Sequence, residues 1–289
     1  MPTVHHFAQG PVHPAAAYLL AFLGAVLGLT CTARARAARR PGQRRYWLTT
    51  AAFAIGGGIW LMHFTAMLGF DVPDSPVRYD PGTTLVSAVL AVGIVGLGLT
   101  IVGTGAGPGW KILAAGLLTG TGVAAMHYTG MAALRISGRI GYDPTVVGAS
   151  VLVAVAAATV ALWLSVTVTG RGPILVASVI MALAVCGMHY TAMAAMRVEL
   201  HPDGQPVPGF DPITLILPIV GTTMVLVVGL VFGALQTATQ EDFVRPMPVP
   251  APRPAGHRQQ PHPVSLAAFS APVPARVPST GSGAEQFRH

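Results

Sequence analysis

Long apolar stretches constrain this chain more than any other feature of its sequence. A bilayer core of ~30 Å is crossed by about 20 helical residues. Seven segments meet this requirement: Pro14 to Thr32, Tyr46 to Phe70, Thr83 to Gly103, Lys111 to Leu134, Thr145 to Thr169, Ile174 to Arg197 and Ile213 to Leu235. Charged residues make up only 9% of the 289 positions, which is too few for a soluble surface of this size. The chain is therefore predicted to be an all-α integral membrane protein with seven transmembrane helices.

Basic residues are distributed unequally between the predicted loops. One side holds 13 of the 17: six arginines from Arg34 to Arg45, then Lys111, Arg171 and the five arginines of the C-terminal tail. Because loops rich in Lys and Arg stay in the cytoplasm, this side is predicted to be cytoplasmic. An odd number of spans then places the N-terminus outside the plasma membrane. Topology accounts for the basic clusters, so nucleic acid is not expected as a partner.

The predicted domain organisation has three parts. Residues 1–13 form an extracytoplasmic segment without a cleavable signal sequence, in which the histidines His5, His6 and His13 are expected to be solvated. Residues 14–235 form the membrane domain. Residues 236–289, rich in Pro, Ala, Ser and Arg, are predicted to be a disordered cytoplasmic tail. The tail contains no recognisable catalytic domain, so the chain is not expected to be an enzyme.

A six-residue motif occurs three times. It reads MHFTAM at Met62 to Met67, MHYTGM at Met126 to Met131 and MHYTAM at Met188 to Met193, and its histidines are 64 and 62 residues apart. This spacing predicts a parallel unit of two spans, repeated at about 46–110, 111–172 and 173–235, with the first span as an extra element.

Each return span follows an aromatic residue, an Asp and a Pro. These triplets are Tyr79 to Pro81, Tyr142 to Pro144 and Phe210 to Pro212. Asp is a favourable N-cap and Pro a favourable first helical residue, so the triplets predict three helix starts.

The three motif histidines are expected to lie at one depth. The motif spans run in the same direction and place His63, His127 and His189 about 22 to 26 Å from their inner ends, where they can form a ring. Imidazole and thioether are soft donors suited to Cu(I), and three nitrogens also suit Cu(II) or Zn(II). Copper is therefore the expected ion. The predicted ligands are Met62, His63, Met67, Met126, His127, Met131, Met188, His189 and Met193.

Other residues near the motifs have simpler interpretations. A lone intramembrane His or Met is usually an interface or core residue, and only the three matched copies favour a functional site. Cys186, three residues before His189, is a weaker candidate ligand, and both it and Cys31 are predicted to be free thiols. The motif threonines are expected to hydrogen-bond to a carbonyl one turn back. Close helix packing is expected at Gly56, Gly57, Gly58, Gly116 and Gly120.

The three motifs resemble the MHYT domain, a bacterial membrane sensor domain named for this tetrapeptide, over roughly residues 14–235. The resemblance implies a sensory module whose motif Met and His residues bind copper and detect oxygen, carbon monoxide or nitric oxide. Family members often continue into a cyclic-di-GMP enzyme, a histidine kinase or a DNA-binding domain. Here the signal is expected to pass to an unknown cytoplasmic partner in trans, through the Arg-rich loop Ala33 to Arg45 or the tail.

Two other functions use the same residues. A copper-handling or transport protein would place polar residues at successive depths, whereas the sequence places them in one outer layer. A bis-His haem protein would use two of the three histidines as iron ligands. Electron transfer across the membrane would also need histidines near the inner face, and the sequence has none there.

Overall fold

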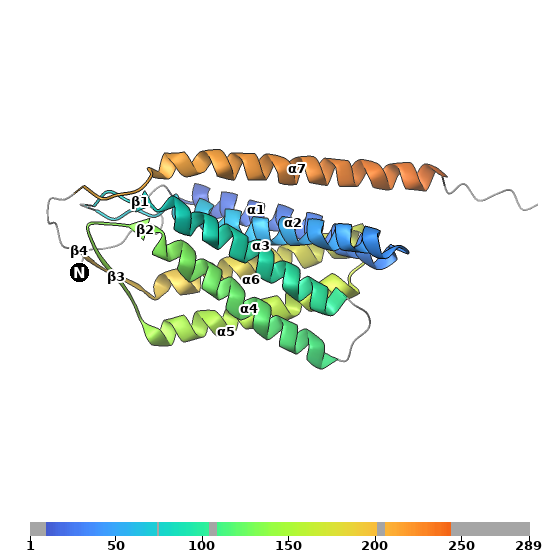
Figure 1. Cartoon of the computed structure of the whole chain (residues 1–289), viewed down its shortest axis with the longest axis horizontal. Helices are drawn as coiled ribbons and strands as arrows, with labels where there is room; N and C mark the ends of the chain where they lie inside the picture. The colour runs from blue at the N-terminus through green and yellow to red at the C-terminus, as the bar shows by residue number, and fades with distance from the viewer. Residues whose placement is uncertain (1–9, 74, 104–108, 201–205, 244–289) are drawn as a thin grey trace, which may run out of the picture. The chain divides into compact units, whose positions relative to one another are not determined.

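The computed structural model describes residues 10–73, 75–103, 109–200 and 206–243 (Figure 1). Within these ranges the predicted number of seven helices is confirmed. Their bounds are α1 Val12–Ala37, α2 Pro41–Met67, α3 Pro81–Gly103, α4 Gly109–Ala132, α5 Pro144–Thr167, α6 Arg171–Ala194 and α7 Pro212–Phe243. The predicted tail from 236 to 289 lies outside the described residues, except that its first residues continue α7 to Phe243.

Five of the described helices are long and apolar enough to cross a membrane: α1, α2, α3, α5 and α6. Helix α4 is not among the five; its sequence is less apolar and contains His127 with several glycines and threonines. In α7 only the shorter segment Pro212–Val225 is comparably apolar. The described chain is thus a mostly helical bundle with five candidate membrane spans.

The first six helices form a closed ring. Each described helix from α1 to α5 packs against the next one in the chain, and α6 packs against α1. The motif helices α2, α4 and α6 therefore alternate around the ring with α3, α5 and α1. Helix α7 packs chiefly against α1 and α2, and Figure 1 shows it running along the bundle. The extra first helix thus occupies the ring position where the third return helix would otherwise lie.

Glycines allow the ring helices to approach closely. A Cβ added to Gly24 of α1 would lie 2.9 Å from the Cα of Gly58 in α2. A Cβ on Gly56 would lie 2.7 Å from the Cα of Val92 in α3. Gly116 and Gly120 of α4 meet α5 in the same way, so the predicted close packing is confirmed for four of the five glycines. Gly57 is the exception, because a Cβ there would meet only Thr222 at 3.9 Å.

The predicted Arg-rich loop from Ala33 to Arg45 is wrong. Only Ala38, Arg39 and Arg40 separate α1 from α2, because Ala and Arg are strong helix formers and extend α1 to Ala37. The guanidinium of Arg36 donates hydrogen bonds to the carbonyls of Ser165 and Val168 at the end of α5. Part of the arginine cluster therefore closes the end of the ring.

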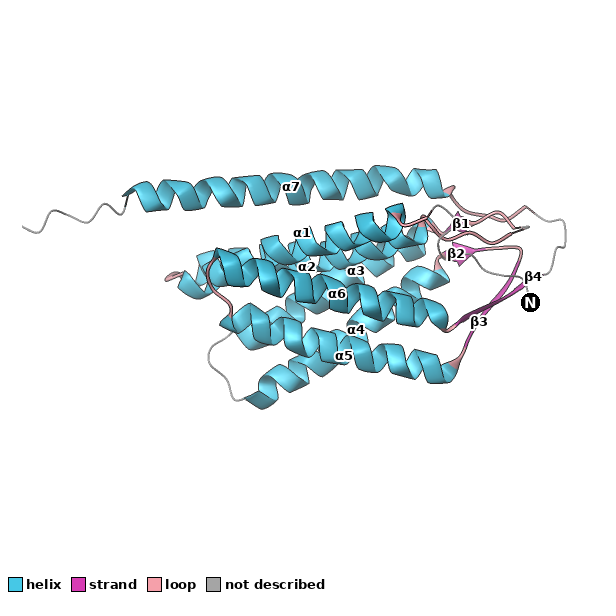
Figure 2. Ribbon diagram, turned by 180° about the vertical axis from the view of Figure 1, so that it is seen from behind, coloured by secondary structure: helices cyan, strands magenta, loops and turns pink. Residues whose placement is uncertain are grey.

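Four short strands correct the all-α prediction. Strand β1 (Arg78–Tyr79) pairs with β2 (Leu134–Arg135), and β3 (Gly138–Tyr142) pairs with β4 (Met196–Leu200), both antiparallel. The predicted spans had placed Leu134, Met196 and Arg197 in helices. Backbone groups beyond the helix ends need partners, and pairing between loops supplies them. Figure 2 shows the strands at one end of the bundle, called the strand end below.

The aromatic-Asp-Pro triplets do more than begin helices. The carboxylate of Asp143 accepts hydrogen bonds from the N–H groups of Thr145 and Val146, which confirms one predicted N-cap. The N–H of Asp143 donates to the carbonyl of Ala195, just beyond α6, and its carboxylate lies 2.6 Å from the guanidinium of Arg197. The contacts with Ala195 and Arg197 join the second repeat to the third.

The first repeat is joined to its neighbours in a similar way. The carboxylate of Asp80 accepts a hydrogen bond from the N–H of Thr83. The backbone N–H of Asp80 donates a hydrogen bond to the carbonyl of Ala133. Tyr79 exchanges two backbone hydrogen bonds with Phe210. The loops of all three repeats are therefore linked above the motif helices.

Candidate metal centre

Three buried imidazoles meet near the strand end. His63 of α2, His127 of α4 and His189 of α6 each lie about one turn before the end of their helix and are each 1% exposed. The Nδ1 atom of His189 lies 3.1 Å from that of His63 and 3.3 Å from that of His127. The potential ligand atoms of the three rings all lie within 4.8 Å of one another. The structure therefore brings together the three histidines that the repeat spacing placed at one depth.

Hydrogen bonds between the three imidazoles do not satisfy all of their Nδ1 atoms at once. A neutral imidazole has one N–H donor and one acceptor nitrogen. The Nδ1 of His189 carries either a proton or a lone pair, so it makes one good hydrogen bond with His63 or with His127. One proton or one lone pair cannot align with both neighbours at once, so the other close contact lacks a well-aligned hydrogen bond. A cation placed between the three nitrogens would instead attract all three lone pairs.

The nitrogen spacing fits a transition metal. Imidazole nitrogens bind Zn²⁺ at ~2.0–2.1 Å in tetrahedral geometry, which separates neighbouring ligand nitrogens by ~3.3 Å. Two of the three separations, from His189 to His63 and to His127, are 3.1 and 3.3 Å, and all three ligand atoms lie within 4.8 Å of one another. Three convergent nitrogens without a carboxylate are also a donor set that disfavours hard ions such as Mg²⁺ or Ca²⁺. The three histidines could therefore hold a metal ion.

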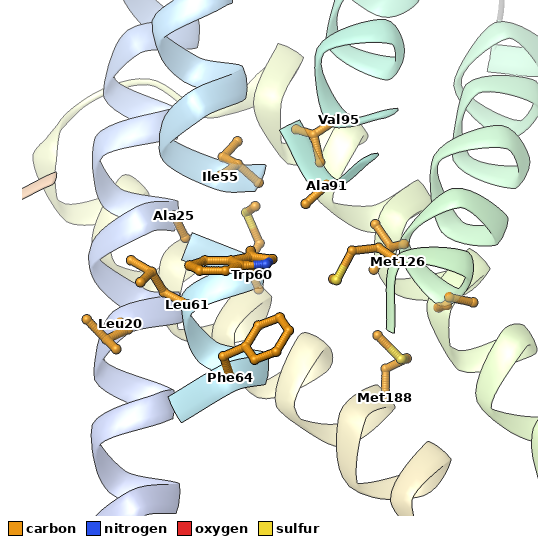
Figure 3. Packing of buried hydrophobic residues seen from close by; sticks show 14 of the residues in the cluster. Leu20, Ala25, Ile55, Trp60, Leu61, Phe64, Ala91, Val95, Met126 and Met188 are labelled. Atoms are coloured by element: carbon orange, nitrogen blue, oxygen red, sulfur yellow. The ribbon is translucent and has the colours of Figure 1, made fainter. Parts of the chain in front are cut away.

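The six predicted methionine ligands are buried around this centre. Their exposed fractions are all 4% or less: Met62, Met67, Met126, Met131, Met188 and Met193. Met62 packs with Cys186 in a small apolar cluster, whereas the other five belong to the main core. Figure 3 shows Met126 and Met188 in the same interior region as Trp60 and Phe64. Among the described His, Cys, Asp and Glu residues the convergent group consists of the three histidines, and Cys186 does not join it.

The first repeat compensates for having Phe64 in place of tyrosine. In the second repeat, the hydroxyl of Tyr128 hydrogen-bonds to Ser150 of α5 at 2.8 Å. Ser87 of α3 is the equivalent serine in the first repeat, and there the indole N–H of Trp60 donates to it at 3.1 Å. A hydrogen bond from a motif helix to the following helix is thus kept with a different donor.

Gly130 is a site residue that the sequence analysis missed. A Cβ at this position would overlap the Nε2 atom of His63. The equivalent positions in the other two motifs are Ala66 and Ala192, so an exchange of Ala for Gly within an otherwise matching motif was the available signal.

Two smaller expectations need correction. Thr191 does bond to the carbonyl of Gly187 one turn back, but the buried hydroxyl of Thr65 has no hydrogen-bond partner among the described residues. His13 is only partly exposed: its side chain packs on Gly69, and its Nδ1 is buried without a partner in the described ranges. His5 and His6 lie outside the described residues.

Comparison with known proteins places the chain in a family. The family model described as MHYT, "Bacterial signalling protein N terminal repeat", matches residues 56–116, 120–178 and 183–249. The chain is 48% identical over 160 residues to the bifunctional diguanylate cyclase/cyclic di-GMP phosphodiesterase MucR of Pseudomonas aeruginosa, covering 53% of this chain and 23% of that protein. No solved structure matches the chain.

Two further relatives show the same partial coverage. The cyclic di-GMP phosphodiesterase NbdA of Pseudomonas aeruginosa is 38% identical over 168 residues, and the signaling protein YkoW of Bacillus subtilis is 30% identical over 170 residues. In each case the match covers 56% of this chain and only 21% of the relative. Three repeats of the family model together match more than half of this chain, and the chain therefore belongs to the MHYT family of integral membrane signalling domains.

Proposed function

We propose that the chain is a membrane sensor that binds one metal ion, with copper as the expected ion, through the Nδ1 atoms of His63, His127 and His189. The convergence of these atoms at 3.1 and 3.3 Å in a fully buried site carries the proposal. An intramembrane ionisable residue is costly, and three at one point are explained by a shared ligand. The signalling names of the relatives support a sensory role.

The sensed ligand is proposed to be a small diatomic molecule such as oxygen, carbon monoxide or nitric oxide. When bound, an ion with three protein nitrogens supplies an open coordination position for such a ligand. The chain's own contribution is to hold three rings nearly perpendicular to one another, with centroids 4.8 to 5.1 Å apart. It also keeps water away, since the rings are buried beneath the linked loops.

The two alternative functions fit the geometry less well. A bis-His haem has its two axial nitrogens on opposite faces of a planar macrocycle. The Nδ1 atoms of His63 and His189 lie 3.1 Å apart with the third imidazole beside them, which leaves no plane for a porphyrin. A transporter needs polar groups beyond the first site, whereas the side chains one and two turns below the histidines are almost all apolar.

The proposed topology follows the arginine distribution. The strand end, with the N-terminus, faces outside, and the C-terminal tail lies in the cytoplasm of a cell whose plasma membrane holds the protein. Ligand binding shifts such a bundle only by its different affinity for two arrangements of the helices. A cytoplasmic signalling partner acting in trans, bound by the tail, is proposed to receive the change.

Metal analysis of full-length protein purified in mild detergent tests this function. One ion per chain is expected in the unchanged protein, with strong loss in His63→Ala, His127→Ala or His189→Ala. Thr65→Ala is the matched control because Thr65 is also buried in a motif and lacks a ring nitrogen. An optical spectrum separates haem from copper. Full metal content in the triple His variant would overturn the proposal.

A further inference from the structure

An apolar cavity of about 70 Å³ lies inside the helix ring, next to the histidine centre. Its lining repeats the three-fold pattern of the motif. Four residues before the three histidines stand Ile59, Val123 and Val185, and eight residues before them stand Ile55, Thr119 and Met181. Residues at these spacings share one helix face. The face that directs each histidine inward therefore also directs these side chains into the cavity.

The wall formed by α5, which packs between α4 and α6, explains why the space is empty of side chains. Helix α5 lines it with Ala154, Ala157, Ala158 and Ala161, whose single methyl groups do not reach across the ring. Met188, the residue before His189, lines the cavity at the histidine side. Of the alanines, Ala154 is buried and the other three are half-buried.

The chemistry of the lining selects its occupant. Thr119 carries the only hydroxyl among the described lining residues, and it has no hydrogen-bond partner in the described ranges. A buried water needs about two to four polar partners, so this single hydroxyl does not hold one. Apolar cavities of ~150 Å³ stay dry and bind benzene or xenon. The present cavity is about half that size, which admits a dissolved gas and excludes an aromatic ring.

We propose that this cavity binds a small apolar gas molecule and passes it to the histidine centre beside Met188. Gas binding follows from the volume and lining alone. Delivery to the centre rests on the proposed function, because it requires a metal ion there.

Xenon is the probe for the binding step, since it is apolar and reacts with nothing in the site. Full-length protein in detergent is titrated with xenon and followed by xenon NMR. Binding is expected in the unchanged protein and in Thr119→Val, which keeps the volume and removes the hydroxyl. It is expected to be lost in Ala154→Leu and Ala158→Leu, whose added side chains fill the space. Ala156→Leu, on the exposed face of the same helix, is the matched control and keeps it.

The outcomes separate the cavity from the metal centre. Absence of xenon binding in the unchanged protein, or its persistence in both filled variants, overturns the proposed cavity whatever the metal content. For delivery, carbon monoxide association with copper-loaded protein is expected to slow by about tenfold in Ala158→Leu, because the cavity has no room for both the leucine side chain and the gas molecule. Equal rates in Ala158→Leu and Ala156→Leu, at equal copper content, overturn delivery. If the unchanged protein binds no copper, the proposed function is contradicted, but the xenon result still holds for the cavity.

Discussion

The imidazole of His63 packs directly against the backbone of Gly130, so that a Cβ at Gly130 would overlap its Nε2 atom. The contact joins α2 to α4 at the depth of the three histidines. It explains why the second motif has glycine where the first and third have Ala66 and Ala192. The position of the His63 ring therefore depends on a residue 67 positions away.

The Gly130→Ala variant is expected to lose most of its bound metal while remaining folded. The overlapping atom is the tip of a side chain, so the ring of His63 shifts and the backbone need not move. Gly187→Ala is the control, because an added Cβ there meets open space. Metal content and thermal unfolding are measured together. Equal metal content in the two variants would contradict the role given to Gly130.

The hydrogen bond from Trp60 to Ser87 is expected to be replaceable. Trp60→Phe removes a buried hydrogen bond worth about 1 kcal/mol and also buried apolar volume, so the free energy of unfolding should fall by more than about 1 kcal/mol. In the double variant Trp60→Phe with Phe64→Tyr, the new phenol should reach Ser87 as Tyr128 reaches Ser150, and part of the loss should return. Thermal unfolding in detergent measures both. A double variant no more stable than Trp60→Phe would show that the two repeats are not equivalent here.

Stability at the strand end is expected to depend on acid pH through Asp143. Hydrogen bonds from the N–H groups of Thr145 and Val146, aided by Arg197, hold the pKa of Asp143 below its ordinary value of 3.8. A lowered folded pKa means that the stabilisation is complete above the ordinary pKa and is lost as the pH falls through the folded value.

The measurement compares unfolding temperatures of the unchanged protein and Asp143→Asn from pH 7 to pH 3. The unchanged protein should be more stable at pH 7, and the difference should shrink below about pH 4. A difference that stays constant over this range would mean that the charge of Asp143 is not the cause.

Topology is tested with reporter fusions. A reporter active only in the cytoplasm should work when fused after Gln236 and fail when inserted between Pro73 and Arg78, because the basic residues mark the opposite end from the strands. The reverse result would place the metal centre at the cytoplasmic face.

Removal of residues 244–289 should leave metal binding intact and abolish capture of a cytoplasmic partner. This truncation keeps α7 whole, since the helix continues to Phe243. Metal content and partner capture are compared between the full and shortened chains. Loss of metal would show that these residues support the bundle, and unchanged capture would move the contact to another cytoplasmic segment.

Features that depend on nearby residues were predictable from the sequence. Apolar length predicts helices because each backbone group bonds within its own segment. The spacing of His63, His127 and His189 predicted a common depth, because rise per residue is constant along a helix. Asp143 was recognisable as an N-cap, since it bonds to N–H groups two and three residues away.

Other features were decided by contacts between residues far apart in the chain. The sequence did not show that α1 lies between α6 and α2, that Leu134 pairs with Tyr79, or that Gly130 makes room for His63. It also did not show that Nδ1 is the nitrogen that points to the centre. Helix faces and depths follow from local periodicity, but the rotation of each helix and the orientation of each ring follow from how neighbouring helices pack. For that reason the sequence determined which residues share a helix face and a depth, whereas the tertiary structure alone decided which residues from different helices and loops meet, and in what orientation.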